Sequence, residues 1–307
     1  MHNMIYTREP EYERNFWNAM RGKGKAIADI DKGLNKDTGT FALPNAADND
    51  YAKAIIVESL FRQIATTAKA YDTSFTIFAK YCSDLAKFVP ENGNIPIYES
   101  ADDFTPYKIE NWKLAALIKC DEDFVHDAAF DFKKYLVTRL ARNFGKAETS
   151  GFITGTGDHM PTGILHDTAG AEIGTETSSL TYDDIIKLYF SVKDEYRSKA
   201  VWLMNDKTAM TLRTIKDSAG NYLWRSIDDT IFSKKIIISE FMPDIAKGNK
   251  PIAFGDFSYY WVVERRTISV RPIYEKFAAN NQIGYLAIEF LDGKLIRPEA
   301  IKVIQIS

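Results

Sequence analysis

The strongest constraint on the fold is an apolar repeat between Asp121 and Ser150. Its members recur at the spacing of one helical face and predict a single long helix: Val125, Ala128, Ala129, Phe132, Leu136, Leu140 and Phe144. About 24 residues of α-helix would span roughly 36 Å, which is long for a globular domain. The polar face of this helix is basic in its second half, with Lys133, Lys134, Arg139, Arg142 and Lys146.

Composition limits the class of protein. The chain has 307 residues, 45% of them hydrophobic, which is enough for one large or two medium domains with apolar cores. A net charge of −3 does not indicate a general nucleic-acid binder. No apolar run approaches the roughly 20 residues that span a bilayer, and the first residues lack the apolar core of a signal peptide. Cys82 and Cys120 show no pairing pattern, which favours a reduced, cytosolic setting.

The first part of the chain, Met1 to Leu43, is rich in charge, glycine and asparagine, and we expect an arm here, not a domain. It contains one predicted helix, on which Tyr12, Phe16, Trp17 and Met20 share a face before Gly22. Asp31 to Thr40 is expected to be flexible. The following segment, Asp50 to Thr67, predicts a short amphipathic helix with Ile55, Ile56, Leu60 and Ile64 on one face.

A long acidic connection separates two segments that resemble strands. Asp72 to Cys82 and Tyr107 to Cys120 are rich in β-branched and aromatic residues. The connection between them holds three prolines and an Asn-Gly pair, and a structureless connection of this length usually has a function. We therefore expect a hairpin that projects from the body of the protein.

The C-terminal half alternates helices and strands, so Leu180 to Arg266 is a plausible α/β unit. Thr181 and Asp184 have the spacing of a capping box, and Gly220 is expected to end a second helix. Asp292-Gly293 lies between two apolar runs, which predicts a closing hairpin.

A glycine-rich loop, GTGDHMPTGILHD, follows the long helix. A phosphate-binding loop would need a lysine and would precede a helix, and neither condition holds. Asp158, His159, His166 and Asp167 match no common zinc spacing. A structural interpretation remains, in which Gly155, Gly157, Pro161 and Gly163 shape a sharp reversal of the chain.

These segments, in this order, resemble the major capsid proteins of tailed bacteriophages, whose Hong Kong phage fold is shared by encapsulin shells. The resemblance is carried by EYERNFWNAMRG, GTFALP, FITGTGDHMPTGIL, VWLMNDKTAMTLRTIKDSAGNYLW and IRPEAI, and it covers Glu11 to Ile306. It implies an α+β fold with an N-terminal arm, an extended loop hairpin, a peripheral domain with a long spine helix, and an axial domain.

The resemblance also implies a division of the chain. Residues 1–49 would be the arm, 50–79 the first part of the peripheral domain and 80–106 the extended loop. Residues 107–179 would hold the spine helix and the glycine-rich loop, 180–267 the axial domain, and 268–307 the closing strands of the peripheral domain.

Two departures from the family's pattern stand out. Only ten residues precede EYERNF, so the scaffolding region that many members carry there would be absent, cleaved or supplied by another protein. Some members join a loop lysine to an asparagine with the help of a glutamate. Asn281 and Glu289 lie near the matching places, but Phe88 to Tyr107 contains no lysine.

The expected function is that of a non-enzymatic subunit of an icosahedral phage or prophage head that encloses DNA, without cofactor, metal or membrane contact. Pentamers and hexamers would form the shell in the host cytoplasm, with a scaffolding protein, a portal and a prohead protease as possible partners. Two alternatives stay open: an encapsulin-like shell around a protein cargo, and a soluble metal-dependent hydrolase that uses His159 and His166.

Charge suggests one contact between subunits. The hairpin tip is acidic, and the long helix is basic. The candidate residues are Glu91, Glu99, Asp102 and Asp103 on the hairpin, and Lys133, Lys134, Arg139 and Arg142 on the helix. In the family, the extended loop of one subunit lies over the peripheral domain of the next.

Overall fold

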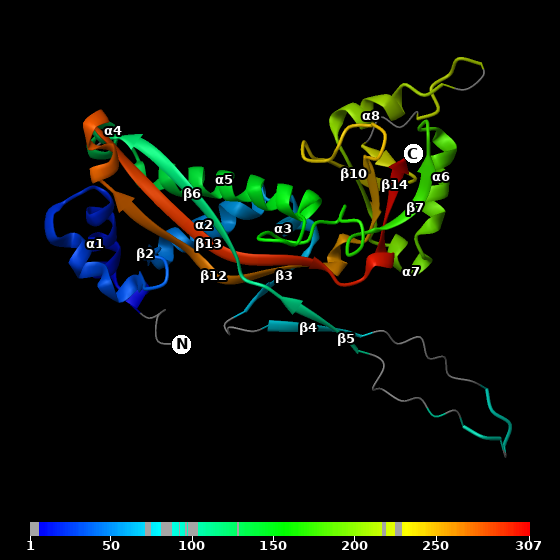
Figure 1. Ribbon diagram of the computed structural model, residues 1–307, viewed down its shortest axis with the longest axis horizontal. Helices are drawn as coiled ribbons and strands as arrows, with labels where there is room; N and C mark the ends of the chain where they lie inside the picture. The colour runs from blue at the N-terminus through cyan, green and yellow to red at the C-terminus, as the bar shows by residue number, and fades with distance from the viewer. Residues whose placement is uncertain are drawn as a thin grey trace.

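The computed structural model describes residues 6–70, 75–80, 88–91, 93–95, 97, 104–127, 129–216, 219–224 and 229–307. These residues form an elongated unit that contains the long helix α5 and a more compact unit beside its C-terminal end (Figure 1). A two-stranded hairpin extends from the elongated unit, on the side of the sheet away from α5 (Figure 1).

The elongated unit is built on a sheet of order β1-β2-β12-β13-β6, with β3 paired in parallel to β12. Its two longest strands, β12 and β13, each have 14 residues and pair antiparallel. The strands span Leu34–Asn35 (β1), Thr40–Ala42 (β2), Thr66–Lys69 (β3), Trp112–Asp121 (β6), Tyr260–Ile273 (β12) and Gln282–Leu295 (β13). The helices of this unit span Tyr6–Arg8 (η1), Pro10–Met20 (α1), Gly24–Gly33 (η2), Asn45–Glu58 (α2), Leu60–Ile64 (α3), Glu122–His126 (α4), Phe132–Thr154 (α5) and Glu275–Asn280 (η5).

The predicted long helix is present, but it begins later than expected. Phe132, Leu136, Leu140 and Phe144 are buried along α5, as the repeat predicts, whereas Val125 belongs to the separate α4. Aspartates between the two helices explain the break. Their side chains accept hydrogen bonds from backbone N–H groups that, in a continuous helix, would donate to backbone carbonyl groups instead. Asp127 accepts from the N–H of Ala129, and Asp131 caps α5 by accepting from the N–H of Lys134.

The N-terminal segment packs against its own subunit. Phe16 and Trp17 of α1 are buried, and Trp17 meets Phe132 of α5 edge-on with ring centroids 6.2 Å apart. The expectation of flexible chain from Asp31 to Thr40 is wrong, because β1 and β2 add to the edge of the sheet through β12. A buried hydrogen bond of 2.6 Å between the hydroxyls of Thr40 and Ser269 fixes this edge.

The predicted helix from Asp50 to Thr67 is divided into α2 and α3 at Ser59, whose backbone is extended. Within α2, Ile55 is buried in the core whereas Ile56 is 48% exposed, so the four residues do not share one face. The reason is close packing, because α5 crosses this break at Gly145. A Cβ atom at Gly145 would lie 2.8 Å from Cβ of Glu58 and 2.9 Å from the backbone nitrogen of Ser59.

The expected projecting hairpin is present at its base. Strands β4, Phe75–Lys80, and β5, Phe104–Ile109, pair antiparallel over their whole lengths. One face of this pair packs on the sheet through Ile77, Ala79 and Ile109, while Phe78 and Phe104 on the other face are exposed.

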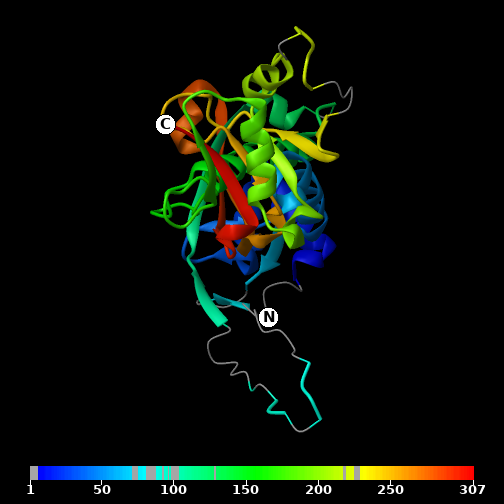
Figure 2. The same cartoon turned by 90° about the vertical axis from the view of Figure 1, so that its right-hand side faces the viewer.

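The compact unit has a second sheet of order β7-β14-β11-β8-β10-β9, covered by helices (Figure 2). Its strands span Glu172–Thr177 (β7), Val201–Met204 (β8), Thr230–Ile231 (β9), Lys234–Ile238 (β10), Ile252–Gly255 (β11) and Ile301–Ile306 (β14). Its helices span Tyr182–Ser191 (α6), Asp194–Arg197 (α7) and Asp206–Arg213 (α8). Two short helices lead into the strands that follow them: Phe257–Tyr259 (η4) into β12 and Pro298–Ala300 (η6) into β14.

The predicted capping box of Thr181 and Asp184 is confirmed at the start of α6. Helix α8 ends at Arg213, before the predicted stop at Gly220.

The predicted closing hairpin at Asp292-Gly293 is wrong. Strand β13 runs straight through both residues, and the chain then crosses to the compact unit, where β14 pairs with β11 and β7. Asp292 is fully buried, and its carboxylate accepts hydrogen bonds from the N–H groups of Glu110 and Gly293. Tertiary hydrogen bonds therefore keep this pair extended where sequence alone favours a turn.

We predict opposite effects for two alanine substitutions in α5. Gly145→Ala should destabilise the protein by about 1–3 kcal/mol, because the new methyl group would overlap the α2–α3 junction. Gly151→Ala is the matched control, since its Cβ atom would lie 3.7 Å from Pro161, an ordinary contact. It should be neutral or stabilise by up to about 1 kcal/mol through helix propensity. Urea unfolding of the two variants checks this, and equal effects would contradict the close-approach argument.

Candidate functional site

The glycine-rich loop closes the C-terminal end of α5 against the sheet. The N–H groups of Ile164 and Leu165 donate to the carbonyl oxygens of Phe152 and Ile153, at 2.8 and 3.0 Å. The N–H of Thr162 donates to the carbonyl of Gly293 on β13, and the hydroxyl of Tyr260 on β12 donates to the carbonyl of Thr162. The loop thereby uses carbonyl groups that the end of a helix would otherwise leave unpaired.

The glycines of the loop serve this geometry in two ways. Gly157 has a φ of +76°, in the left-handed region that disfavours side chains. Gly155 and Gly163 lie back to back, and a Cβ atom on Gly163 would come within 2.5 Å of the backbone nitrogen of Gly155. Pro161 is buried, and its carbonyl accepts from the N–H of Gly157. These positions fit the structural interpretation of the loop.

The polar residues of the loop do not converge. His159 is 89% exposed, with its ring edge-on to Trp112 and its Nε2 3.5 Å from Asp158. His166 accepts backbone hydrogen bonds from Thr168 and Ala169 at its Nδ1 atom. Asp167 forms an ion pair of 2.8 Å with Lys250, which holds the pKa of that carboxyl below its usual range. Within the described ranges, no group of three or more His, Cys, Asp or Glu side chains is placed to hold a metal ion.

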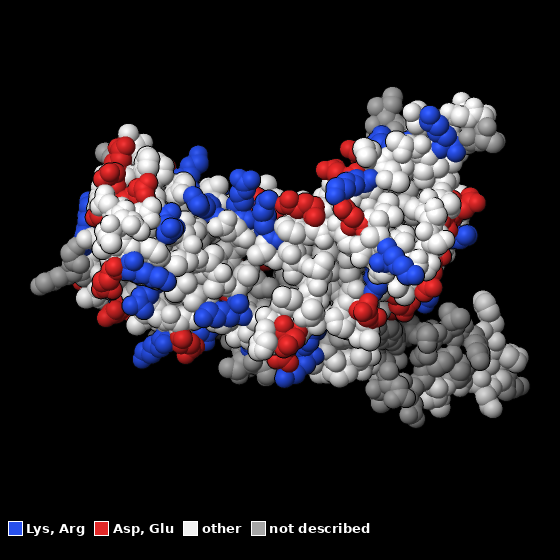
Figure 3. Space-filling model, turned by 45° about the horizontal axis from the view of Figure 1, so that its top comes forward, with Lys and Arg blue, Asp and Glu red and all other residues white. Residues whose placement is uncertain are grey.

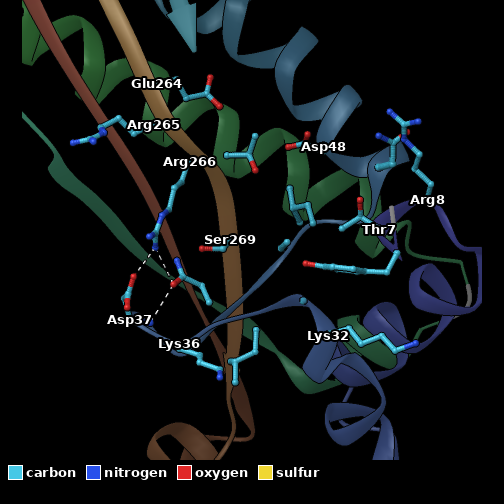
Figure 4. Close-up of a pocket in the computed structure, with 18 of the residues that line it drawn as sticks. Thr7, Arg8, Lys32, Lys36, Asp37, Asp48, Glu264, Arg265, Arg266 and Ser269 are labelled. Carbon is cyan, nitrogen blue, oxygen red and sulfur yellow. Dashed lines mark hydrogen bonds and ion pairs between the residues drawn. The ribbon is translucent and has the colours of Figure 1, made fainter. Parts of the chain in front are cut away.

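A cleft of about 590 Å³ lies between the N-terminal segment and strand β12 (Figure 4). Charges of both signs line it, and Arg266 is directed at Asp37, which it meets at 2.8 Å (Figure 4). Burial raises the pKa of Asp48 at its inner wall. This mixture of charges selects no single class of ligand. The lining residues with full charge are Arg8, Asp31, Lys32, Lys36, Asp37, Asp48, Lys69, Glu264, Arg265 and Arg266.

A buried charge cluster that the sequence did not predict lies beneath α3. We call it the Arg62 cluster and define it as Tyr51, Arg62, Glu148, Glu264 and Glu289. The guanidinium of Arg62 binds Glu148 through two nitrogens, at 2.6 and 2.9 Å, and Glu289 at 2.8 Å. Glu148 and Glu289 are both fully buried. Their positions in the sequence carry a signal, because Glu148 lies on the apolar face of the long helix and Glu289 interrupts the apolar run GYLAIEFL.

The residues predicted to join neighbouring subunits are not part of this cluster. Lys133, Lys134, Arg139 and Arg142 are exposed along α5, and Lys and Arg side chains are visible along this side of the elongated unit (Figure 3). Lys133 already pairs with Glu13 of its own chain at 3.3 Å, and Arg139 stacks on Tyr135. On the hairpin, Glu91 is exposed, whereas Glu99, Asp102 and Asp103 lie outside the described residues.

Comparison with known proteins identifies the family. The chain matches the model of the phage capsid family over residues 39–306. The protein belongs to the phage capsid family. A search of curated proteins gave no match.

Solved structures agree with the family match. The capsid of a native GTA particle is 29% identical with a TM-score of 0.68, covering 83% of this chain and 90% of that chain. The capsid of an empty GTA particle is 28% identical with a TM-score of 0.67, covering 81% and 90%. A structure from Microbacterium phage Oxtober96 is 14% identical with a TM-score of 0.61, covering 81% and 91%, and shows the fold alone. The expected α+β capsid fold is therefore confirmed.

In the described parts of this capsid protein, no helix is long and apolar enough to cross a membrane.

We predict that the glycines of the loop matter and that its histidine does not. Valine at Gly155, Gly157 or Gly163 should lower stability by about 1–3 kcal/mol or prevent assembly, because of steric overlap or positive φ. His159→Ala should stay within about 0.5 kcal/mol of the parent, since the side chain is solvated. Thermal unfolding and particle yield measure both effects. A severe defect confined to His159→Ala would favour the metal-site hypothesis over the structural interpretation of the loop.

Proposed function

We propose that this protein is the structural subunit of an icosahedral head shell of a tailed phage or prophage, and that the shell encloses genomic DNA. The observation that carries the proposal is the family match over residues 39–306, together with the likeness to a GTA particle capsid at 29% identity. Pentamers and hexamers of the subunit would tile the shell. An encapsulin-like shell around protein cargo is the competing function, and the comparisons do not favour it.

The exposed apolar residues of the extended loop support an assembling protein. Phe88, Ile95 and Ile97 are at least 78% exposed, which is unusual for large apolar side chains that stay in water. In a shell, a neighbouring subunit would cover them. Overlapping loops of this kind turn many modest contacts into a strong assembly.

The domain boundaries are also part of the proposal. We assign residues 1–49 to the arm, 80–106 to the extended loop, 50–79, 107–171 and 260–267 to the peripheral domain, and 172–259 to the axial domain. The boundaries at 172 and 260 follow from β7, which pairs with β14 in the second sheet, and from β12, which begins at Tyr260 in the first sheet. Of the closing residues, 268–295 stay with the peripheral domain through β12 and β13, whereas β14 pairs within the sheet of the axial domain. A scaffolding protein, a portal and a prohead protease are proposed partners on the strength of the resemblance alone, as is assembly in the host cytoplasm.

The shell proposal predicts particles whose formation depends on the extended loop. The full chain should form closed shells, tubes or rings in negative-stain images, with nuclease-protected DNA in particles from infected or induced cells. Deletion of Val89 to Asp103 should leave a folded subunit that does not assemble, because β4 and β5 keep their pairing while the contact surface is lost. Circular dichroism controls for folding. Normal particles from the deletion variant would exclude a role of the loop, and protein cargo in place of DNA would favour the encapsulin-like function.

The contact between the acidic loop tip and α5 stays a prediction, and the structure offers a second basic surface that the loop tip could contact instead. Lys113 and Lys119 of β6 are exposed on the face of the sheet away from α5, so a neighbouring loop could meet either basic surface. Each exposed ion pair would contribute only about 0–1 kcal/mol, so the contact would act through its repetition over the shell. It would also weaken with salt.

Charge reversal separates the two surfaces. Asp102→Lys with Asp103→Lys should impair assembly. Lys134→Glu with Arg142→Glu should partly restore it if the loop lies on α5, since neither cation has an ion pair within the described structure. Lys113→Glu with Lys119→Glu is the matched alternative. Light scattering over a salt series measures assembly. Rescue by the β6 pair alone would move the contact to the other face, and normal assembly of the loop reversal would refute an electrostatic contact.

A further inference from the structure

The Arg62 cluster joins the elements on which the peripheral domain is built. Tyr51 comes from α2, Arg62 from α3, Glu148 from α5, Glu264 from β12 and Glu289 from β13. Arg62 is the centre, because it contacts all three carboxylates, with Glu264 at 3.2 Å. Its Nη2 atom donates to both Glu148 and Glu289, so these two carboxylates converge on one nitrogen.

The cluster has too few positive charges for its carboxylates. Three glutamates share one guanidinium, and the next cation, Lys69, lies 4.0 Å from Glu264 with its side chain 53% exposed. Two of the carboxylates have no access to water, so solvent cannot compensate their charge. When carboxylates share a site in this way, the pKa of one of them is raised, because the like charges disfavour full ionisation.

We infer that the Arg62 cluster retains one proton in the folded subunit near neutral pH, on Glu289, and that release of this proton weakens the attachment of α3 and α5 to β12 and β13. The observation behind it is the geometry of one guanidinium among three carboxylates on four different elements. Proton uptake or release at this point would therefore act on the junction that orients the spine helix. The inference concerns the folded subunit, and it does not depend on the function proposed above.

The groups packed around Glu289 act on its pKa in both directions, and burial is the largest effect. Burial, with Glu148 as the nearest like charge, raises the pKa of Glu289 to about 8, against the opposing effect of Arg62. From α2, the hydroxyl of Tyr51 donates to the other oxygen of Glu289 at 2.8 Å, a hydrogen bond that lowers the pKa of Glu289 and so opposes the effect of burial. Burial raises the pKa of Tyr51 itself. From β6, the residue opposite Glu289 is the uncharged Leu114. Asp48 and Lys69 act from the solvent side, next to Glu264.

The sign of the pH dependence follows from linkage. A carboxyl whose pKa is raised on folding binds its proton more tightly in the folded state than in the unfolded chain. The stability of the folded state therefore falls as pH rises from about 4.5, the ordinary value for glutamate, to about 8. Within this window one retained proton changes the unfolding equilibrium constant by at most about tenfold per pH unit.

The test is a titration of the full-length chain by infrared difference spectroscopy, which detects the carbonyl band of a protonated carboxylic acid in any assembly state. We expect such a band to persist at pH 6 and to disappear toward pH 8 or above, in keeping with the raised pKa of Glu289. Glu289→Gln should abolish it while preserving side-chain shape. Glu264→Gln should keep the band and move its midpoint to lower pH, because a neighbouring negative charge is removed.

Hydrogen exchange of α3 and α5, corrected for its intrinsic pH dependence, provides the structural readout. In the parent protein, protection should fall between pH 6 and 8 by up to about tenfold per pH unit and level off above this range, whereas in Glu289→Gln it should stay flat. A parent spectrum without the band at pH 6 would overturn the inference, as would a band that survives in Glu289→Gln. Equal pH dependence of protection in parent and variant would also overturn it, because the cluster would then be a simple ion-pair network.

Discussion

The attachment of α5 to the long strands β12 and β13 is the contact on which the rest of the structure depends. An apolar stripe provides the burial, with Phe132, Leu136, Leu140 and Phe144 turned toward the sheet. The hydrophobic effect is non-directional, whereas a buried charge is costly unless it meets its partner. Glu148 is that charge, and Arg62 can reach it because α2 ends at Ser59 and because Gly145 lets α5 approach the break.

The same contact connects the two units of the molecule. At its C-terminal end, α5 passes into the glycine-rich loop, which is hydrogen-bonded to β13 at Gly293 and to Tyr260 of β12. Both of these strands continue into the compact unit, β12 from β11 through η4 and β13 into β14 through η6. A displacement of α5 would therefore reach the second sheet through short covalent connections. The glycines of the loop permit this dense crossing of backbones, which explains their number without invoking a ligand.

The subunit leaves apolar surface that its described chain does not cover. Phe78 and Phe104 are exposed at the base of the extended loop, and Phe88, Ile95 and Ile97 are exposed further along it. Surfaces of this kind are costly in a monomer and are typical of interfaces. Their concentration on a hairpin that projects from the sheet is consistent with a protein that is completed by its neighbours in a shell (Figure 1).

The sequence by itself determined the elements whose signals are local. The apolar repeat of α5, the capping box at Thr181 and the helix α1 depend on residues within a few turns of one another, and all three are present. The order of motifs was sufficient for the family and its fold. The structural interpretation of the glycine-rich loop was also accessible, because positive φ and close approach depend on residue type.

Only the tertiary structure decided what depends on distant partners. Asp292-Gly293 favours a turn locally, but hydrogen bonds from Glu110 and the pairing with β12 hold it in a strand. Asp31 to Thr40 has few apolar residues. It is ordered by pairing with strand β12, which lies more than 200 residues further along the sequence. The Arg62 cluster could not be assembled from sequence, since a buried glutamate shows that a partner is needed but does not say which arginine supplies it. The tertiary structure fixes that pairing, because α3, α5 and two strands cross at this point. No short stretch of the sequence indicates that they do.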